Sequence, residues 1–341
     1  MFFLDNQSGI IWRYNPEDGE TQRFIGNGKK ELAVIGADRL ETGLFYPGGF
    51  TTDSNGNFYI SEQHHILKIN EEGKVELFAG PAGRADYGYR DGPVQDALFQ
   101  SIRGLSFDDE SQTLYIADTY NNRIRIIKDG KVSTIAGDGF SGETIFNVKG
   151  TESHLNRPHD VIVSNGQIYI SDSWNNTVVK LDEKGILRPA AGMVSYKVYQ
   201  GEGGYSGDRE DAANAMMNTP LNLYYFEDTL YIVDAFNNRI RAVKDGKIDT
   251  IIGCGKKGYD PENPMVLNLP SAVYVDEQYV YVADTGNYLV RKYKKEYIEK
   301  MNEEKRREKK ISVIIPLIVI FVSILSIFIL IKVRKRNDIS D

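Results

Sequence analysis

The sequence predicts an all-β, six-bladed β-propeller, because one phrase recurs along the chain and each copy has the pattern of short strands. The clearest copies are LYIADTYNNRIRII from Leu114, IYISDSWNNTVVKL from Ile168, LYIVDAFNNRIRAV from Leu230 and VYVADTGNYLVRKY from Val280. Divergent copies lie upstream, FYISEQHHILKI from Phe58 and FFLDNQSGIIWRY from Phe2. Self-similarity with a period of tens of residues indicates one supersecondary unit copied along the chain.

Each copy is predicted to contain four short strands. A β-rich run such as Tyr115 to Ala117 leads into a polar turn and then into a second β-rich run, which is a hairpin pattern. A third strand follows an Asp-Gly turn at Lys131 to Ala136 and again at Lys247 to Ile252. A further strand precedes the hairpin and begins near Pro47, Arg103, Pro158, Pro220 or Pro270. Four strands per copy make one propeller blade.

An acidic residue marks the register of the six copies. These residues are Asp5, Glu62, Asp118, Asp172, Asp234 and Asp284. The first copy has only the later three strands, at Phe2 to Asp5, Ile11 to Tyr14 and Thr21 to Ile25, and the last copy has only the first three, between Pro270 and Tyr293. Both terminal blades are therefore predicted to be one strand short.

The repeat resembles a known family. Pro-x-x-Val, then Tyr-Ile-Ala-Asp, then Asn-Asn-Arg-Ile-Arg, and then a strand ending in Ala-Gly-Asp-Gly is similar to the NHL repeat, which implies a six-bladed NHL-type propeller over residues 1–293. Four copies carry the resemblance strongly. Such a likeness specifies a fold better than it specifies a function.

The repeated acidic residues have two possible roles. Six equivalent carboxylates around a symmetric ring would suit a metal site. An acidic residue in every blade is also what a structural role predicts, with the carboxylate accepting hydrogen bonds from the backbone of its own bend. We favour the structural role, and we predict no metal or other cofactor.

Charge divides the chain. Residues 294–341 hold 12 Lys and Arg against 7 Asp and Glu, which leaves 29 against 41 in residues 1–293. Phosphate neutralisation by basic side chains supplies most of the affinity for nucleic acid. Nucleic acid is therefore an improbable partner for this acidic propeller, although some NHL domains bind RNA through a basic face.

The C-terminal part is predicted to be a membrane anchor. Residues 294–310 alternate in charge and suggest a solvated helix, and Ile311 to Ile331 contains no charged residue, which is long enough to span a bilayer. A short basic tail, residues 332–341, follows, so the chain is predicted to cross the membrane once. The chain could be tail-anchored with the propeller in the cytosol, or a truncated type I protein with the propeller outside. The incomplete first blade and the abrupt basic stop favour the second arrangement.

Function is expected on the long connections between blades, because loops of this kind often bind partners and here share one face. Tyrosines on these loops suit recognition of a protein, and also of a glycan or small ligand, but they could equally pin the loops to the propeller. His159 opens an innermost strand and is expected to face the central channel. The candidate binding residues are Tyr87, Tyr89, Arg90, Tyr196, Tyr199, Tyr205, Asp208 and His159.

The alternative function is a metal-dependent lyase or hydrolase with its site in the central channel. The resemblance to NHL-like lyases implies three zinc-binding histidines, which this chain could assemble only from His159, His154 and one of His64 and His65. No nucleophile motif or paired-carboxylate spacing stands out, so no catalytic residue is predicted. We therefore expect a membrane-tethered interaction module rather than an enzyme.

Overall fold

The computed structural model describes residues 1–83, 86–194 and 203–304. These form two compact units, which are Met1–Asp276 together with Tyr281–Arg291, and a smaller unit that contains Glu277–Val280 and the chain from Lys292.

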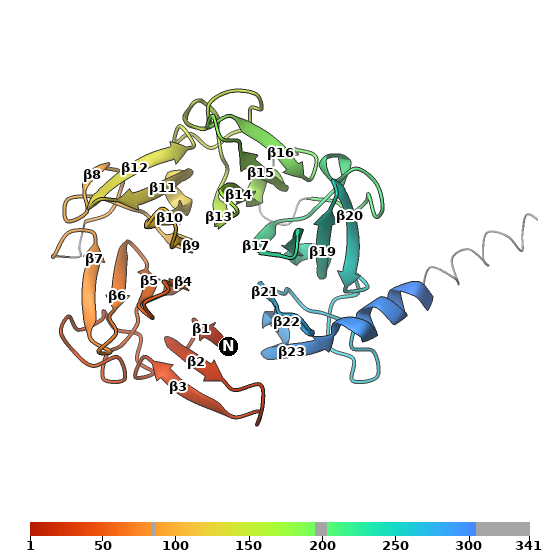
Figure 1. Ribbon diagram of the computed structural model, residues 1–341, viewed down its shortest axis with the longest axis horizontal. Helices are drawn as coiled ribbons and strands as arrows, with labels where there is room; N and C mark the ends of the chain where they lie inside the picture. Colours follow the sequence, from red (N-terminus) through yellow and green to blue (C-terminus); the bar gives the residue numbers. More distant parts are fainter. Residues whose placement is uncertain (84–85, 195–202, 305–341) are drawn as a thin grey trace, which may run out of the picture. The chain divides into compact units, whose positions relative to one another are not determined.

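The larger unit is a six-bladed β-propeller, as predicted, with six antiparallel sheets around a common axis (Figure 1). Blade 1 consists of β1 (Phe2–Asp5), β2 (Ile10–Tyr14) and β3 (Thr21–Ile25). Blade 2 consists of β4 (Pro47–Thr52), β5 (Phe58–Glu62), β6 (His65–Ile69) and β7 (Val75–Ala79). Blade 3 consists of β9 (Ile102–Asp108), β10 (Thr113–Asp118), β11 (Arg123–Lys128) and β12 (Lys131–Ala136). Blade 4 consists of β13 (Pro158–Ser164), β14 (Gln167–Asp172), β15 (Thr177–Leu181) and β16 (Leu187–Ala191).

The last two blades complete the ring of sheets. Blade 5 consists of β17 (Pro220–Phe226), β18 (Thr229–Asp234), β19 (Arg239–Lys244) and β20 (Lys247–Ile252). Blade 6 consists of β21 (Ala272–Val275), β22 (Tyr279–Asp284) and β23 (Leu289–Lys294). Blades 1 and 6 each have three strands, as the sequence indicated. The structure adds a short strand that the sequence pattern did not indicate, β8 (Gly92–Pro93), which pairs with the outer strand β12.

Single turns of 3₁₀-helix separate the second and third strands of four blades. They are η1 (Thr119–Asn121), η3 (Ser173–Asn175), η5 (Ala235–Asn237) and η6 (Thr285–Asn287). Two more lie in the inter-blade connections, η2 (Gly150–Glu152) and η4 (Ala212–Asn214). Asn122, directly after η1, has a φ of 50°, and Asn176 and Asn238 have equivalent backbone conformations. Asparagine tolerates this left-handed region better than most residues, so the Asn-Asn pair ends the turn and starts the next strand.

The core lies between facing blades rather than within any one blade. One cluster joins Tyr59 and Ile66 of blade 2 to Ile116 and Ile127 of blade 3, and similar clusters join blades 1 and 2, 3 and 4, and 4 and 5. A single blade could not bury both of its faces, so each sheet depends on its neighbours for stability.

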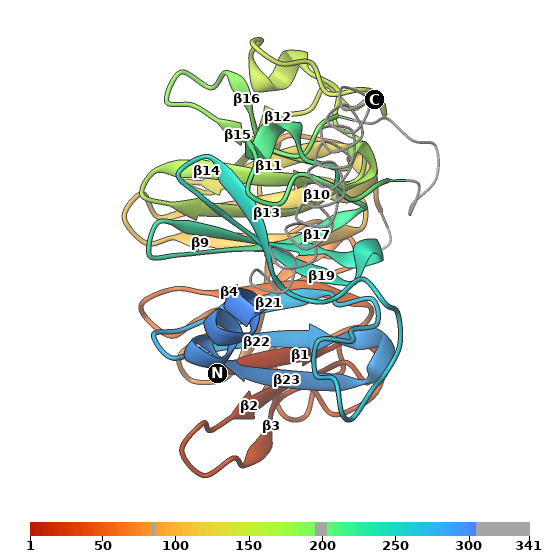
Figure 2. The ribbon, with the colours of Figure 1, turned by 90° about the vertical axis from the view of Figure 1, so that its right-hand side faces the viewer.

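The innermost strands are also joined by hydrogen bonds between blades. These strands, β4, β9, β13, β17 and β21, are adjacent in that order around the axis (Figures 1 and 2). The amide of Leu223 on β17 donates to Asp160 Oδ2 on β13 at 2.9 Å, and the amide of Val273 on β21 donates to Asn222 Oδ1 at 2.9 Å. Polar side chains near the axis therefore bind blade to blade.

In the smaller unit, the chain continues from β23 into a helix over residues 295–304. The Lys292 ammonium lies 4.0 Å from the ring centroid of Tyr279, and Ile298 of the helix is buried. The predicted charged helix is therefore present over its described part, although it is not solvated on every side.

No helix within residues 1–83, 86–194 and 203–304 is long and apolar enough to cross a membrane. The predicted spanning segment, residues 311–331, and the basic tail, residues 332–341, lie outside the described residues.

Candidate functional site

The long connections between blades converge on one end of the propeller. Each inner strand begins at this end, and each second strand finishes there with its repeat carboxylate. We call this surface the loop face. It comprises the turns between second and third strands and the connections 26–46, 80–101, 137–157, 192–219 and 253–271, apart from residues 84–85 and 195–202.

The repeat carboxylates hold these connections in place. Asp118 Oδ1 accepts the amide of Gln100, near the end of connection 80–101, at 2.8 Å. Its Oδ2 accepts Asn121 Nδ2 and Arg125 Nη1, both at 2.8 Å. Asp118 and the Arg125 side chain are completely buried.

The same arrangement recurs in other blades. Asp172, Asp234 and Asp284 accept the loop amides of Asn156, Asn218 and Asn268 and the side chains of Asn175, Asn237 and Asn287. Arg241 and Arg291 occupy the arginine position in blades 5 and 6. Blade 4 has Val179 at that position, and the Thr144 hydroxyl donates to Asp172 instead at 2.5 Å. The connection is therefore anchored to a buried carboxylate in each of these blades.

The prediction that each repeat carboxylate accepts hydrogen bonds from the backbone of its own bend was wrong in most blades. Asp5 accepts from the backbone of its own bend, at 3.0 Å from the amide of Gln7 and 3.2 Å from that of Ser8. Glu62 accepts the amides of Ala33 and Phe45 in connection 26–46. The bend after the other carboxylates is a 3₁₀ turn, so an asparagine side chain and the incoming loop occupy the acceptor sites.

The Asn-Asn pair links blades as well as forming the turn. The first asparagine also donates to a loop carbonyl, for example Asn121 Nδ2 to Gly88 O at 2.6 Å. The second accepts an amide of the next blade, as in Arg157 N to Asn122 Oδ1 at 3.0 Å. Thr219 and Leu269 donate to Asn176 and Asn238 in the same way. Sequence reasoning identified turn formers and missed this role, for which the fixed Asp-x-x-Asn-Asn spacing was the available signal.

Burial changes the acidity of these carboxylates. It raises the pKa of Asp118, Asp172 and Asp234 to about 6, even though hydrogen bonds, and Arg125 and Arg241 in two of the three, act in the opposite direction. Each folded-state pKa lies above the unfolded value of about 3.9. The stability that protonation supplies is therefore fully present below about pH 4 and is lost as the pH rises through about 6.

Asp172→Asn tests this pH dependence, because Asp172 has no arginine partner and asparagine does not titrate. We expect the substitution to destabilise the protein more at pH 4.5 than at pH 7, with a difference on the order of 1–2 kcal/mol. Urea unfolding at the two pH values measures it. Asp182→Asn is the control, because the pKa of exposed Asp182 is lowered by the amide of Ile186. An equal cost of Asp172→Asn at both pH values would contradict the raised pKa.

Two of the predicted binding tyrosines lie against arginines. The Arg123 guanidinium lies 3.7 Å from the ring centroid of Tyr89, and Arg239 lies 3.6 Å from that of Tyr205. The Tyr205 hydroxyl donates to Asp208 at 2.6 Å, and Asp208 in turn pairs with Arg241 at 2.9 Å. For Tyr89, Tyr205 and Asp208 the structure thus shows contacts of the kind expected if these side chains pin the loops.

The remaining predicted binding residues have varied surroundings. Tyr87 is 61% exposed and stacks on His64 with ring centroids 5.0 Å apart. Arg90 is exposed and donates to the Asp96 carbonyl at 3.4 Å. Tyr196 and Tyr199 lie outside the described residues. Binding by any of these side chains remains a prediction.

The inner strand β13 of blade 4 carries His159 and Asp160 near its start. Burial and the Arg103 charge lower the pKa of His159 to about 3, so the imidazole is neutral. Burial raises the pKa of Asp160 to about 7. Gly104 on β9 leaves room for this carboxyl, because a Cβ there would lie 2.0 Å from Asp160 Oδ1.

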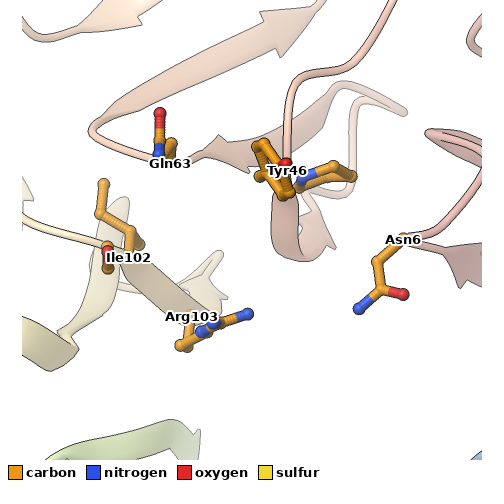
Figure 3. Close-up of a pocket in the computed structure, with 7 residues that line it drawn as sticks. Asn6, Tyr46, Gln63, Ile102 and Arg103 are labelled. Atoms are coloured by element: carbon orange, nitrogen blue, oxygen red, sulfur yellow. The ribbon is translucent and has the colours of Figure 1, made fainter. Parts of the chain in front are cut away.

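A pocket of about 150 Å³ opens on the loop face among blades 1 to 3 (Figure 3). Blade 1 contributes Asn6 from the turn after β1. Blade 2 contributes Tyr46, Pro47 and Gln63, and blade 3 contributes the start of β9 with Ser101, Ile102 and Arg103. The side chains of Asn6 and Arg103 extend toward each other across the pocket (Figure 3).

Comparison with known proteins finds an NHL repeat in this chain. The NHL repeat family model matches residues 155–181, which include β13 and the hairpin of blade 4. NHL repeat-containing protein 2 of Bos taurus is 28% identical over 178 residues, which cover 48% of this chain and 24% of that protein. The chain therefore contains an NHL repeat within its six-bladed propeller, and it is similar to NHL repeat-containing proteins. The match spans only part of each relative. It covers between 24% and 38% of the length of four similar proteins, three of which are NHL repeat-containing protein 2 from different animals.

Solved structures share the fold of this NHL propeller at low sequence identity. An auxiliary nutrient binding protein from Bacteroides ovatus has a TM-score of 0.58 and 12% identity, with 85% of this chain and 65% of that chain covered. A chain of the nidogen/laminin complex has a TM-score of 0.55 and 17% identity, with 86% and 88% covered. Identity at this level shows the fold alone.

The histidines of this NHL propeller do not form the metal site of the alternative function. His64 accepts the amide of Ser101, His154 pairs with Asp138 at 2.8 Å, and His159 lies on β13 within electrostatic reach of Arg103. Within residues 1–83, 86–194 and 203–304, no group of three His, Cys, Asp or Glu side chains could hold a metal ion. The repeat carboxylates likewise lie apart, each within its own blade.

Proposed function

We propose that this NHL propeller is a membrane-tethered interaction module whose loop face binds a protein partner or a small ligand. The observation that carries the proposal is the fixed backbone of the connections. Amides and carbonyls at described positions of these connections are hydrogen bonded to Asp and Asn side chains, which restrains those parts of the loops before a partner arrives. Preorganisation of this kind reduces the entropic cost of binding.

Large side chains on the same connections and turns are exposed to solvent. These aromatic residues are Tyr46, Tyr87, Tyr120, Phe140, Phe236 and Tyr259. The Arg157 guanidinium lies 3.7 Å from the Tyr120 ring centroid and 5.4 Å from that of Trp174, which orders this part of the face. Rigid aromatic side chains contribute most of the binding energy at many protein interfaces.

The structural neighbours support a binding role. One is named for nutrient binding and another for a complex of nidogen with laminin. Their low identity to this chain leaves the chemistry of the partner to be argued from the residues of this loop face.

The binding proposal predicts that exposed aromatic residues are needed for partner capture. Cross-linking on membranes that carry the full chain, followed by mass spectrometry, should identify proteins or ligands linked to the loop face. Replacing Tyr87, Phe140 and Phe236 together with serine should reduce their recovery about tenfold or more, as expected for the loss of binding hot spots. Tyr297→Ser is the matched control, because Tyr297 is an exposed aromatic residue but lies on the helix over residues 295–304, which is not part of the loop face. Equal recovery with the triple variant would contradict the proposal.

The membrane tether is proposed from residues 311–331, which carry no charge over a length sufficient to span a bilayer. The full chain should fractionate with membranes and require detergent, whereas a chain that ends at residue 310 should be released. Protease added to intact cells should degrade the propeller if it lies outside, as we propose. Release of the full chain without detergent would refute the tether, and a propeller that is protected until permeabilisation would reverse the orientation.

A further inference from the structure

The pocket among blades 1 to 3 is lined by Arg103, by four neutral polar side chains and by Pro47 and Ile102, and no carboxylate is among the lining residues. Asn6 and Gln63 provide amides, Tyr46 and Ser101 provide hydroxyls, and Arg103 provides a guanidinium. This lining is unusual in a propeller whose 293 residues carry 41 acidic against 29 basic side chains. Because Arg103 is the only charged residue that lines the pocket, its field favours a negatively charged occupant.

The two carboxylates nearest in sequence are already occupied. Asp5 precedes Asn6 and accepts the Ser8 hydroxyl at 2.6 Å and two backbone amides. Glu62 precedes Gln63, is completely buried and accepts the amides of Ala33 and Phe45. Both are absent from the pocket lining. They therefore do not supply a counter-ion for Arg103.

Arg103 differs from the three arginines that lie seven residues after a repeat carboxylate. Arg125, Arg241 and Arg291 are each paired with a repeat carboxylate at 2.6 to 3.3 Å. The Arg103 guanidinium forms neither a hydrogen bond nor an ion pair with the part of the chain that the structure describes. A guanidinium that is half-buried, unpaired and directed into a pocket is suited to a planar oxyanion, which it can bind through two parallel N–H groups.

The size of the pocket limits what it can hold. A cavity of 150 Å³ accommodates a ligand of about six non-hydrogen atoms, the size of benzene. Inorganic phosphate and short carboxylates fit this limit, and so does the terminal carboxylate or phosphate of a ligand that continues into the solvent.

His159, on the neighbouring strand β13, is close enough to Arg103 for the two to interact electrostatically.

We propose that this pocket binds the oxyanion group of a small ligand, a carboxylate or a phosphate, with Arg103 as the anchoring residue and Asn6 facing it across the site. The inference rests on the proposed function, because it assigns a ligand chemistry to one part of the loop face. It adds that this part recognises negative charge, which the acidic composition of the propeller would not suggest.

Calorimetric titration of the full chain in detergent tests the site, with sodium phosphate, succinate and acetate as probes at constant ionic strength. At least one probe should bind with a Kd of about 1 mM or tighter, as expected for one charge-assisted contact with additional donors. The ranking of the three probes distinguishes a phosphate from a carboxylate ligand. Arg103→Gln should weaken binding about tenfold or more, and Asn6→Asp should weaken it through repulsion.

Arg23→Gln is the matched control, because Arg23 is exposed on β3 outside the pocket. It should bind the probes as the wild type does, and thermal unfolding should show that Arg103→Gln remains folded. The proposal is overturned if the wild type binds none of the probes up to about 10 mM, or if Arg103→Gln binds as tightly as the wild type. Partner capture by the exposed aromatic residues is measured separately, so it can succeed where the oxyanion site fails.

Discussion

Asp118→Ala should lower the free energy of unfolding by about 3–5 kcal/mol, because it breaks a buried ion pair from one side. The carboxylate holds Arg125, Asn121 and the loop amide of Gln100 at 2.8 Å each. Its removal leaves a fully buried guanidinium with only the half-exposed Asp91 as a charged partner. Urea unfolding at pH 7 measures the change.

Two further variants make this result specific. Asp182→Ala breaks an ion pair with Arg188 that is exposed on both sides, so it should change stability far less. Asp118→Ala combined with Arg125→Met should cost less than the sum of the two single changes, because no buried charge is left unpaired. A cost for Asp118→Ala no larger than that of the exposed pair would show that the carboxylate does not anchor the connection.

Phe99→Ala should also destabilise the protein by about 3–5 kcal/mol, the usual cost of removing a large buried aromatic ring. Phe99 lies in connection 80–101 but is completely buried in the cluster between blades 2 and 3. Its ring centroid is 5.0 Å from the Arg125 guanidinium. The substitution should therefore loosen the loop face as well as the core.

Phe140→Ala is the control for this prediction. Phe140 also lies in an inter-blade connection, but 71% of it is exposed, so its loss should change stability by no more than about 0.5 kcal/mol. Thermal and urea unfolding of both variants provide the comparison. Similar stabilities for the two variants would mean that connection 80–101 contributes nothing to the core.

Most of the propeller could be predicted from local pattern. The predicted strands Phe2 to Asp5, Thr21 to Ile25, Lys131 to Ala136 and Lys247 to Ile252 are the observed β1, β3, β12 and β20. Turn residues and alternating β-rich runs act over a few neighbouring positions, so a sequence displays them directly. The missing strands in blades 1 and 6 were predictable for the same reason.

The partners of the repeated polar residues were not predictable in this way. Arg123 and Arg239, five residues after their Asp, pack on tyrosines, whereas Arg125 and Arg241, seven residues after it, make the ion pairs. In each strand the two arginines are two residues apart, so the alternation of side chains along a strand predicts that both point to the same face of the sheet. These ion pairs form between neighbouring strands of one blade, and only the packed structure shows which arginine makes them.

The sequence by itself determined the blade count, the strand positions and the equivalence of the six acidic residues, because a repeat displays these as spacing. Only the tertiary structure decided that Asp118, Asp172, Asp234 and Asp284 bind the connections, that asparagines bind the next blade, and that Arg103 is left unpaired at a pocket. The carboxylate contacts join the end of a second strand to the connection that precedes the same blade, and the asparagine contacts join one blade to the next. Their partners are set by how neighbouring sheets pack around the axis, and no local pattern encodes that packing.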